Sequence, residues 1–493
     1  MPYKITLTAV LLLSIAVLVV AQFSIATLFG ADGYLHMRMA QFIREKGLRY
    51  DFHWARYSTF AKNFADKDLL YHVALIPFTL LPNMIMAGKI SACLWTVFLY
   101  LVYFWMLRRY CPTKNLIPVF LFMFLCSAPF VQAISQARNM VLVMGLTLLF
   151  IHFLILKKQV ALFIITVVYA LSHVSSPYLL VFAVLAESAR FANSKEFYWR
   201  SLRAVALGLV LGFLIHPNFP NNLLIFYLNG ILVPVFALKW GLELGAEFFP
   251  ISTRDYILEH PFIIIAVILF ISLGASQKSK VRPSTAIWMS VAAFFFVFSF
   301  FSQRYITHGY PLILIALASY VSDWWQGEGR LPALKRSRGL RWSLGIGVVL
   351  LLALMGARTY RAFSKLAQVE AVYNGHFQAV GAWMAQNIPA GETIFHSNWS
   401  DSQYLIGVNP QNDYFVTLDP IYMYYWNSKK YNLYRDIAFG RSPDPYAALR
   451  DEFDTRYGYV GKNYFSGLIH QIRPDPRFEV MAEDGLGLIF RLK

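Results

Sequence analysis

The sequence contains few charged residues. Only 14% of its 493 residues are Asp, Glu, Lys or Arg, whereas 57% are hydrophobic and 17% are aromatic. Soluble proteins carry about 25% charged residues, so this composition argues against a soluble enzyme and predicts a protein with many membrane spans. The first 22 residues resemble a signal peptide, but the apolar run continues to Phe29 without a small-residue cleavage site. We therefore expect them to form a retained first span.

Cysteine is also scarce. The three cysteines, Cys93, Cys111 and Cys126, fall in or beside apolar segments. We therefore expect no disulfide in the hydrophilic C-terminal part and no metal site built on sulfur. The sequence also lacks HExxH, GxSxG, P-loop and Rossmann glycine motifs, which disfavours soluble hydrolases, nucleotide-dependent enzymes and ATP-driven pumps.

The net charge of +17 is unevenly distributed. Residues 360–493 carry thirteen cationic and fourteen acidic side chains, so the excess lies in short loops between apolar segments. This pattern is typical of the positive-inside rule, and it removes the need to invoke nucleic-acid binding. The cations of the loops that we expect on the cytoplasmic side are Arg108, Arg109, Lys114, Lys157, Lys158, Arg190, Lys195, Arg200, Arg203, Lys278, Lys280, Arg282, Arg330, Lys335, Arg336, Arg338 and Arg341.

Windows of about 20 apolar residues predict eleven transmembrane helices. Their approximate ranges are 5–29, 84–107, 115–131, 139–156, 160–175, 176–192, 203–217, 261–276, 284–302, 305–322 and 342–358. With the N-terminus in the cytoplasm, eleven spans place residues 30–72, 216–260 and 359–493 on the outer side. We therefore expect an α-helical polytopic membrane domain at 1–358, in a bacterial inner membrane, and a periplasmic domain at 359–493.

The C-terminal region has the composition of a soluble domain. Its patterns predict helices at 363–388, 402–406, 445–453 and 466–472, and strands at 393–396, 414–418, 457–460, 478–481 and 487–491. Such alternation is typical of a small α/β domain. Two apolar segments of the outer loops are too short to span. We expect 69–82 and the middle of 216–260 to lie at the membrane interface or to enter the membrane in part.

The first outer loop, residues 30–72, is long, polar and highly charged. It contains seven cations and five acids, although the surrounding chain is mostly apolar. A simple connection between two spans needs only a few turn residues, so this loop predicts a functional site. Its cations lie outside despite the positive-inside rule, which an anionic ligand such as a lipid-linked phosphate would explain. Arg38 and Arg56 are the candidate phosphate ligands within it.

Asp32 lies where the first span leaves the membrane. A carboxylate at that depth can act as a general base on an acceptor hydroxyl or bind a metal, and its alternative role is to cap an amphipathic helix. His36 follows at i+4 on the same helical face and is a candidate donor-phosphate ligand. Asp66 and Asp68 form a DxD motif, which can hold Mg²⁺ or Mn²⁺ on a diphosphate or can cap the following helix. We rank these two acids second.

The remaining candidates lie near other outer segments. Arg304 and Tyr305 stand at the outer end of one span and Arg138 between two others. Each can bind a lipid phosphate or anchor its span at the interface. His216 and Glu247 belong to the loop 216–260 and are second-rank candidates, because single histidines at span ends are more often structural.

The stretch DGYLHMRMAQFIRE, which begins at Asp32, resembles the first outer loop of the oligosaccharyltransferase catalytic subunit. The layout of the whole chain resembles the wider GT-C superfamily of membrane glycosyltransferases. The resemblance implies an inverting transfer of a sugar from a polyprenyl-phosphate or polyprenyl-diphosphate donor, with Asp32 as the catalytic or metal-binding acid. The chain lacks the WWDYG signature, and SNWSDSQY at 397–404 matches it only loosely. It also lacks an acid in 132–140, where the family has a second DxD.

The sequence therefore predicts a membrane glycosyltransferase whose acceptor is a glycan, a lipid or a protein. A divalent cation, Mg²⁺ or Mn²⁺, is a candidate cofactor, with Asp32 as its ligand. Two alternatives stay open: a glycan ligase or polymerase that uses a lipid-linked polymer, and a transporter or flippase of lipid-linked sugars. A transporter predicts charges within the spans and broken helices, and Lys89 is the clearest charge of that kind.

Overall fold

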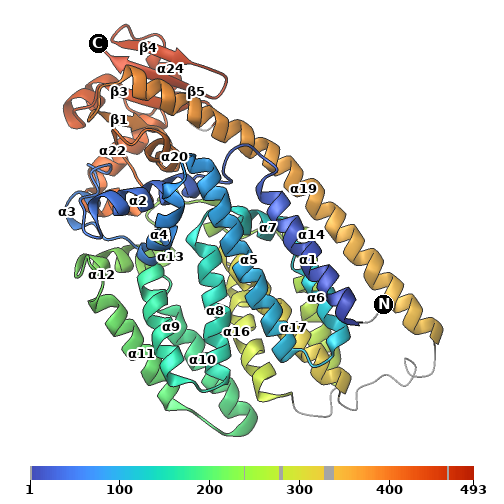
Figure 1. Cartoon of the computed structure of the whole chain (residues 1–493). Coiled ribbons are helices and arrows are strands. Elements are labelled where there is room, and N and C mark those ends of the chain that lie inside the picture. Colours follow the sequence, from blue (N-terminus) through green and yellow to red (C-terminus); the bar gives the residue numbers. More distant parts are fainter. Residues whose placement is uncertain (1–2, 238, 277–280, 327–337, 464–465) are drawn as a thin grey trace. The chain divides into compact units, whose positions relative to one another are not determined.

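The computed structural model describes residues 3–237, 239–276, 281–326, 338–463 and 466–493 (Figure 1). Of the predicted cytoplasmic cations, Lys278, Lys280, Arg330, Lys335 and Arg336 lie outside the described residues. The chain divides into two compact units. The first consists of Met1–Ser24, Ser91–Phe213 and Gly245–Ala367, and the second of Ile25–Ile90, Leu214–Leu244 and Gln368–Lys493.

All regular secondary structure in the described residues of the first unit is helical. Its elements are α1 (Tyr3–Gln22), most of α5 (Met84–Tyr110), η2 (Lys114–Leu116), α6 (Ile117–Met123), α7 (Ala128–Ser135), α8 (Asn139–Ile155), α9 (Gln159–Ser172), α10 (Tyr178–Ser194), α11 (Trp199–Leu214), η4 (Ala246–Phe248), α14 (Thr253–Glu259), α15 (Pro261–Ser276), α16 (Pro283–Ser299), α17 (Gln303–Gln326) and the first part of α19 (Arg338–Asn387). One continuous cluster of buried apolar side chains joins these helices and forms the core.

Three helices are long and apolar enough to cross a membrane, and five spans result if each of two bent helix pairs counts as one. The three lie in α1, α5 and α19. Several other predicted spans correspond to shorter apolar helices: α8, α9 and α16 have 17, 14 and 17 residues. The apolar helices bear out a membrane protein, while the number of spans stays a prediction.

The predicted span at 115–131 is not one continuous helix. The chain bends by 76° between η2–α6 and α7. Ser127 caps α7 by accepting the backbone N–H of Phe130, and Pro129 occupies its first turn, which is a helix start signal inside an apolar run. A second pair, α14 and α15, bends by 89°. The two bends meet, because Ser127 Oγ lies 3.2 Å from Nδ1 of His260.

The predicted span 342–358 and the predicted helix 363–388 form one helix, α19, of 50 residues. At 1.5 Å per residue it is about 75 Å long. The change of composition at residue 360 predicted a break, but no proline interrupts the segment, and the helix ends just before Ile388 and Pro389. The C-terminal part of α19 belongs to the second unit.

The second unit contains the first outer loop and the C-terminal residues. Its helices are α2 (Asp32–Lys46), α3 (Phe60–Asn63), α4 (Leu69–Leu75), η1 (Ile76–Leu80), α12 (Asn221–Phe226), η3 (Tyr227–Leu232), α13 (Val233–Phe236), α20 (Asp401–Val408), α21 (Pro420–Trp426), α22 (Ser428–Ala438), α23 (Pro445–Ala447), η5 (Ala448–Glu452) and α24 (Ser466–Ile472). The predicted short helix at 69–82 is present as α4 and η1. Helices α21 and α22 were missed, although Asp419 and Asn427 cap them.

A five-stranded sheet organises the C-terminal residues (Figure 1). Its strands are β1 (Thr393–His396), β2 (Asp413–Tyr414), β3 (Tyr457–Gly461), β4 (Phe478–Glu483) and β5 (Gly487–Leu492). The order is β2-β1-β3-β5-β4, with β1 parallel to β2 and β3, and β5 antiparallel to β3 and β4. The predicted α/β pattern is confirmed, except that the strand predicted at 414–418 stops at Tyr414.

Candidate functional site

Helix α2 carries the residues that the sequence singled out. Asp32 is its first residue, and the preceding Ala31 offers no side chain for a cap. A carboxylate in the first turn stabilises a helix through the macrodipole. Asp32 is half-buried, and its charge acts on His36, one turn later and buried. The i+4 spacing therefore brings the two side chains to one face, as predicted.

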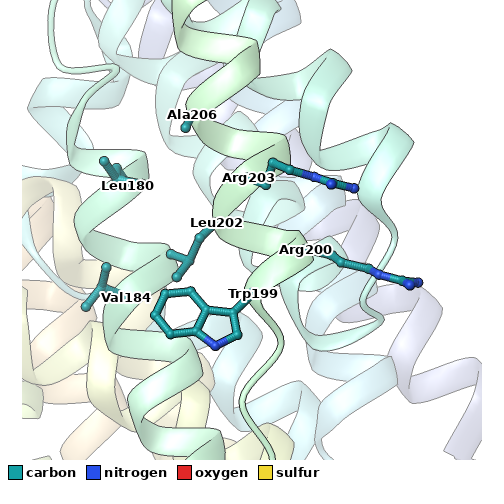
Figure 2. Close-up of a pocket in the computed structure, with 7 residues that line it drawn as sticks. All are labelled: Leu180, Val184, Trp199, Arg200, Leu202, Arg203 and Ala206. Atoms are coloured by element: carbon teal, nitrogen blue, oxygen red, sulfur yellow. The ribbon is translucent and has the colours of Figure 1, made fainter.

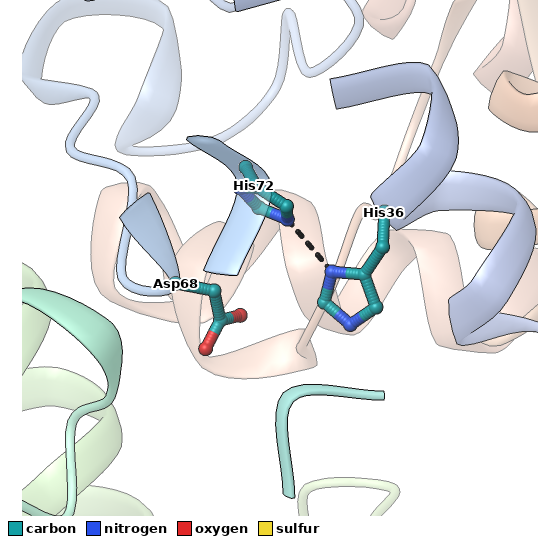
Figure 3. Close-up of side chains that lie close together, drawn as sticks. All are labelled: His36, Asp68 and His72. Carbon is teal, nitrogen blue, oxygen red and sulfur yellow. Dashed lines mark hydrogen bonds between the residues drawn. The ribbon is translucent and has the colours of Figure 1, made fainter. Parts of the chain in front are cut away.

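His36 belongs to a buried chain of hydrogen bonds with α4 and the residues before it. His36 Nδ1 lies 2.7 Å from His72 Nε2 (Figure 3). His72 Nδ1 lies 2.7 Å from Asp66 Oδ2. A carboxylate only accepts, so His72 donates its Nδ1 proton to Asp66. That hydrogen bond turns His72 Nε2 toward His36, and α2 and α4 are held together at this point.

Opposite influences act on the two imidazoles. Burial and the charge of His72 lower the pKa of His36 to about 4, so His36 is neutral at physiological pH. Burial also lowers the pKa of His72, but the charge and hydrogen bond of Asp66, with the charge of Asp68, outweigh it and raise the pKa above the ordinary value. Neutral His36 can therefore accept a hydrogen bond or bind a metal, while His72 is protonated more readily than an ordinary histidine.

These residues also form a group that fits a metal ion. One donor atom each from His36, Asp68 and His72 lies within 4.8 Å of the others, and all three residues are buried (Figure 3). Two imidazoles and a carboxylate suit Zn²⁺ and similar transition metals better than Mg²⁺, which prefers oxygen ligands. Asp66 lies behind His72 as the second carboxylate, the partner that metal-binding histidines usually have. Asp32 is not one of the three donors.

The DxD motif is divided between two roles. Asp66 is 3% exposed, accepts the backbone N–H of Asp68 through Oδ1, and bonds His72 through Oδ2. Its carbonyl oxygen accepts a hydrogen bond from His216 Nε2 at 3.0 Å, so His216 fixes the backbone of the motif. Burial lowers the pKa of His216, despite the opposing effect of Asp66, and keeps it neutral. Only Asp68 is left to serve as a ligand.

The two candidate phosphate ligands of the first loop have protein partners. Arg38 donates to the carbonyl of Gly407 at 2.7 Å and to Gln41 Oε1 at 2.7 Å, and so attaches α2 to α20. Arg56 is exposed and lies 3.7 Å from Asp454. Neither faces the His36–His72 group through a contact in the described part of the chain, so we place the phosphate elsewhere.

Glu370 of α19 is a residue of the site that the sequence did not predict. Its Oε2 accepts the backbone N–H of Gly30 at 3.2 Å and lies 3.3 Å from Asn374 Nδ2, which also donates to the Leu28 carbonyl at 2.6 Å. Burial raises the pKa of this carboxylate, which the two hydrogen bonds oppose. The pair thus fixes the backbone just before Asp32, where Gly30 has a φ of 69°. The only sequence signal was an acid and an amide at i and i+4 on one helix.

In the first unit, Arg138 and Arg304 lie at the starts of two helices. Arg138 precedes α8, and Arg304 is the second residue of α17. His308 donates to the Arg304 carbonyl at 2.8 Å and is close enough to both arginines for their charges to act on it. Helix N-termini carry partial positive charge, so two of them with two guanidiniums favour an anion.

The other candidates of this unit surround Arg304. Glu247 lies 3.7 Å from its guanidinium, and the ring of Phe248 lies 4.5 Å below it. The hydroxyl of Tyr305 lies 3.1 Å from that of Tyr178, at the start of α10. Arg304, Tyr305 and Glu247 therefore form one group. The sequence had offered them as candidates but did not predict that they lie together.

Comparison with known proteins gave structural matches only. No family model and no curated protein matches the chain. ArnT from Cupriavidus metallidurans bound to undecaprenyl phosphate matches at a TM-score of 0.58 and 15% identity, over 97% of both chains. The Archaeoglobus fulgidus oligosaccharyltransferase matches at a TM-score of 0.61 and 14% identity, over 92% of this chain and 69% of that one. The mycobacterial arabinofuranosyltransferase AftD matches at 0.51 and 14%, over 98% of this chain and 40% of its own.

These three proteins are GT-C glycosyltransferases, and the similarity extends over nearly all of the chain. At 14–15% identity it concerns the fold alone. The chain therefore has the GT-C fold that its first outer loop and its layout predicted.

Proposed function

We propose that the protein is a membrane glycosyltransferase. It transfers a sugar from a polyprenyl-phosphate or polyprenyl-diphosphate donor to a glycan, lipid or protein acceptor at the outer face of the membrane. The observation that carries this proposal is the full-length likeness to a structure that holds undecaprenyl phosphate. A second structure of this fold, the Archaeoglobus AglB, holds dolichol phosphate and an inhibitory peptide.

The donor phosphate binds at Arg138 and Arg304. Two helix N-termini and two guanidiniums supply positive charge there, and guanidinium bonds phosphate oxygens in pairs. Glu247, 3.7 Å from Arg304, holds that side chain in place and partly balances its charge before the donor arrives. As the glycosidic bond breaks, the phosphate leaves with the bonding electrons, and the arginines stabilise that charge.

Asp32 serves the acceptor. Its carboxylate takes the proton of the acceptor hydroxyl while that oxygen attacks the anomeric carbon, with inversion. Glu370 and Asn374 hold the backbone before Asp32. Because Asp32 lies in the first turn of α2, the helix fixes the face on which its carboxylate lies. The activated donor supplies the free energy, so no nucleotide is needed.

A divalent metal ion would be held by His36, Asp68 and His72. When bound, it would supply a positive charge that stabilises anionic oxygens near α2. In its absence, the hydrogen bonds of His36, His72 and Asp66 link α2 to α4, and so hold Asp32 at a constant orientation.

The topology completes the proposal. Eleven spans with a cytoplasmic N-terminus place the first loop and the region 216–260 on the outer side of a bacterial inner membrane. We propose the same division into a membrane domain at 1–358 and an outer domain at 359–493. Lys157 is one of the cations that we expect on the cytoplasmic side, and its Nζ lies 2.7 Å from Glu196. This ion pair supports a location of the loops after α8 and α10 on the same side of the membrane.

A transporter of lipid-linked sugars is the second candidate, and one observation favours it. The two bent helix pairs meet at Ser127 and His260, and transporters build substrate sites from broken helices. The charge predicted within a span, Lys89, bonds the Ile25 carbonyl, which is a structural role. A glycan ligase or polymerase uses the same outer residues and differs in its acceptor.

Replacement of Asp32 tests the proposal. Membranes containing the full chain are given undecaprenyl-phosphate sugars labelled in the sugar, and the label that leaves the lipid is measured. General-base catalysis contributes about 10²–10⁴-fold, so we expect Asp32→Asn to lower the rate at least about 100-fold. Asp51→Asn, an exposed acid of the same loop, is the matched control.

Normal transfer by Asp32→Asn at equal expression would remove Asp32 from the mechanism. Movement of label across the membrane without transfer would favour the transporter.

A further inference from the structure

A groove of about 450 Å³ lies between α10 and α11 in the first unit, and nothing in the proposed reaction uses it (Figure 2). Leu180 and Val184 from α10 and Leu202 from α11 give it apolar walls. The indole of Trp199, which is 70% exposed, lies beside Val184. Such a wall suits a hydrocarbon chain, and Trp is typical of the membrane interface.

Two arginines border this groove. The stems of Arg200 and Arg203 line it, and Figure 2 shows both guanidiniums extending from α11 in the same direction, away from Val184. Both side chains are exposed, and neither has an ion-pair partner in the described part of the chain. An apolar stem with a charged end outside the groove is the arrangement of a snorkelling cation.

The arginines lie at the cationic end of their helices. Helices α9 and α11 run parallel, because Gly208 packs on Thr166 and Gly212 on Ala170. The same offset places Arg200 and Arg203 level with residues 158–161, at the start of α9. Lys157 and Lys158 lie in the turn just before it. The groove therefore opens beside several cations.

This end is remote from the proposed donor site. The side chain of Asn139, next to Arg138, donates to the carbonyl of Ser172 at the far end of α9. Helix α9 has 14 residues, so about 20 Å separate that end from the groove. The two anion sites are thus distinct.

The start of α11 is also fixed in place. The backbone N–H of Tyr198 donates to Glu187 Oε2 at 3.1 Å, and Glu187 pairs with Arg190 at 3.0 Å in a buried contact. Gln159 donates to the Tyr198 hydroxyl at 2.6 Å. The arginines therefore project from a rigid turn, which lowers the entropy lost on binding.

We propose that this groove binds an anionic glycerophospholipid of the bilayer. The lipid phosphate contacts Arg200 and Arg203, and one acyl chain lies along Leu180, Val184 and Leu202. Paired guanidiniums suit a phosphate, and the anionic lipids of a cytoplasmic leaflet carry one next to a long chain. The site is independent of the proposed transfer reaction.

Lipid competition on the purified full chain tests this. Native mass spectrometry measures the preference for dioleoyl-phosphatidylglycerol over dioleoyl-phosphatidylcholine. We expect Arg200→Gln/Arg203→Gln to lower the preference about tenfold, since each cation near anionic lipid contributes a sizeable part of the attraction. The control Arg108→Gln/Arg109→Gln removes the same charge from the last turn of α5, whose residues do not line the groove, and should keep the preference.

A third variant separates the contribution of the apolar groove to lipid binding from that of the two arginine charges. Leu202→Trp keeps both arginines but fills the groove, so it should also weaken phosphatidylglycerol binding. An unchanged preference in either groove variant, or an equal loss in the control, overturns the proposal. Displacement of the lipid by equimolar undecaprenyl phosphate or glycerol 3-phosphate would overturn its assignment to a glycerophospholipid.

Discussion

Asp401 offers a quantitative test of the second unit. It is the acid of the SNWSDSQY segment, the loose counterpart of WWDYG, yet it is 1% exposed. Burial raises its pKa to about 7, and the hydroxyl of Tyr373, 3.1 Å from Oδ1, opposes this only in part. The carboxyl group is therefore protonated in the folded state over a range where the unfolded chain ionises it.

The free-energy consequence follows from linkage. The unfolded pKa is about 3.8, so the folded state holds one more proton than the unfolded state between about pH 4 and pH 7. Stability from this group is fully present below pH 4 and is lost as pH rises to 7. With a shift from 3.8 to about 7, at 1.36 kcal/mol per unit, the loss between pH 5 and pH 8 is about 3 kcal/mol.

Asp401→Asn should remove that pH dependence. The amide oxygen can still accept the Tyr373 hydroxyl, and the amide has no charge to bury. Hydrogen exchange of peptides from β1 and α20 in the full chain, corrected for intrinsic rates, gives the opening free energy at each pH. We expect the variant to gain about 3 kcal/mol on the wild type between pH 5 and pH 8.

The control for this experiment is Asp436→Asn, an exposed acid of α22, which should follow the wild type at both pH values. If Asp401→Asn and the wild type lose stability in parallel, the carboxyl group is ionised in the fold. The reasoning from its burial would then be refuted.

Two further predictions concern the proposed site. His36→Gln should abolish stoichiometric Zn²⁺ binding, and Asp66→Asn should weaken it about 10–100-fold. The control His53→Gln, which replaces an exposed histidine, should keep the Zn²⁺. Plasma emission spectrometry of the purified protein measures the metal content, and full metal content in His36→Gln would reject the site. In correctly folded protein, Arg304→Gln should raise the KM for the lipid-linked donor about tenfold or more, because a charged hydrogen bond to the phosphate is lost. Glu247→Gln should change that KM far less. Equal KM values in the two variants would contradict a phosphate role for Arg304.

The membrane class and the C-terminal strands could be predicted from local signals. Low charge content and apolar runs indicate spans wherever they occur, and β1 was predicted at its observed bounds because buried strands have a short, apolar signature. The i+4 relation of Asp32 to His36 is equally local. The break at Ser127 and the continuity of α19 were missed, since neighbouring structure decides whether a cap or a change of composition ends a helix.

By itself, then, the sequence indicated a membrane protein, and it singled out the first outer loop and Asp32 as the candidate site. Only the tertiary structure decided which groups meet there. His36 meets His72 and Asp68, thirty-odd residues away, Glu370 reaches Gly30 from a distant helix, and Arg38 is committed to Gly407. Hydrophobic periodicity acts within a helix or strand, whereas these contacts depend on how separate elements pack, which no local pattern encodes.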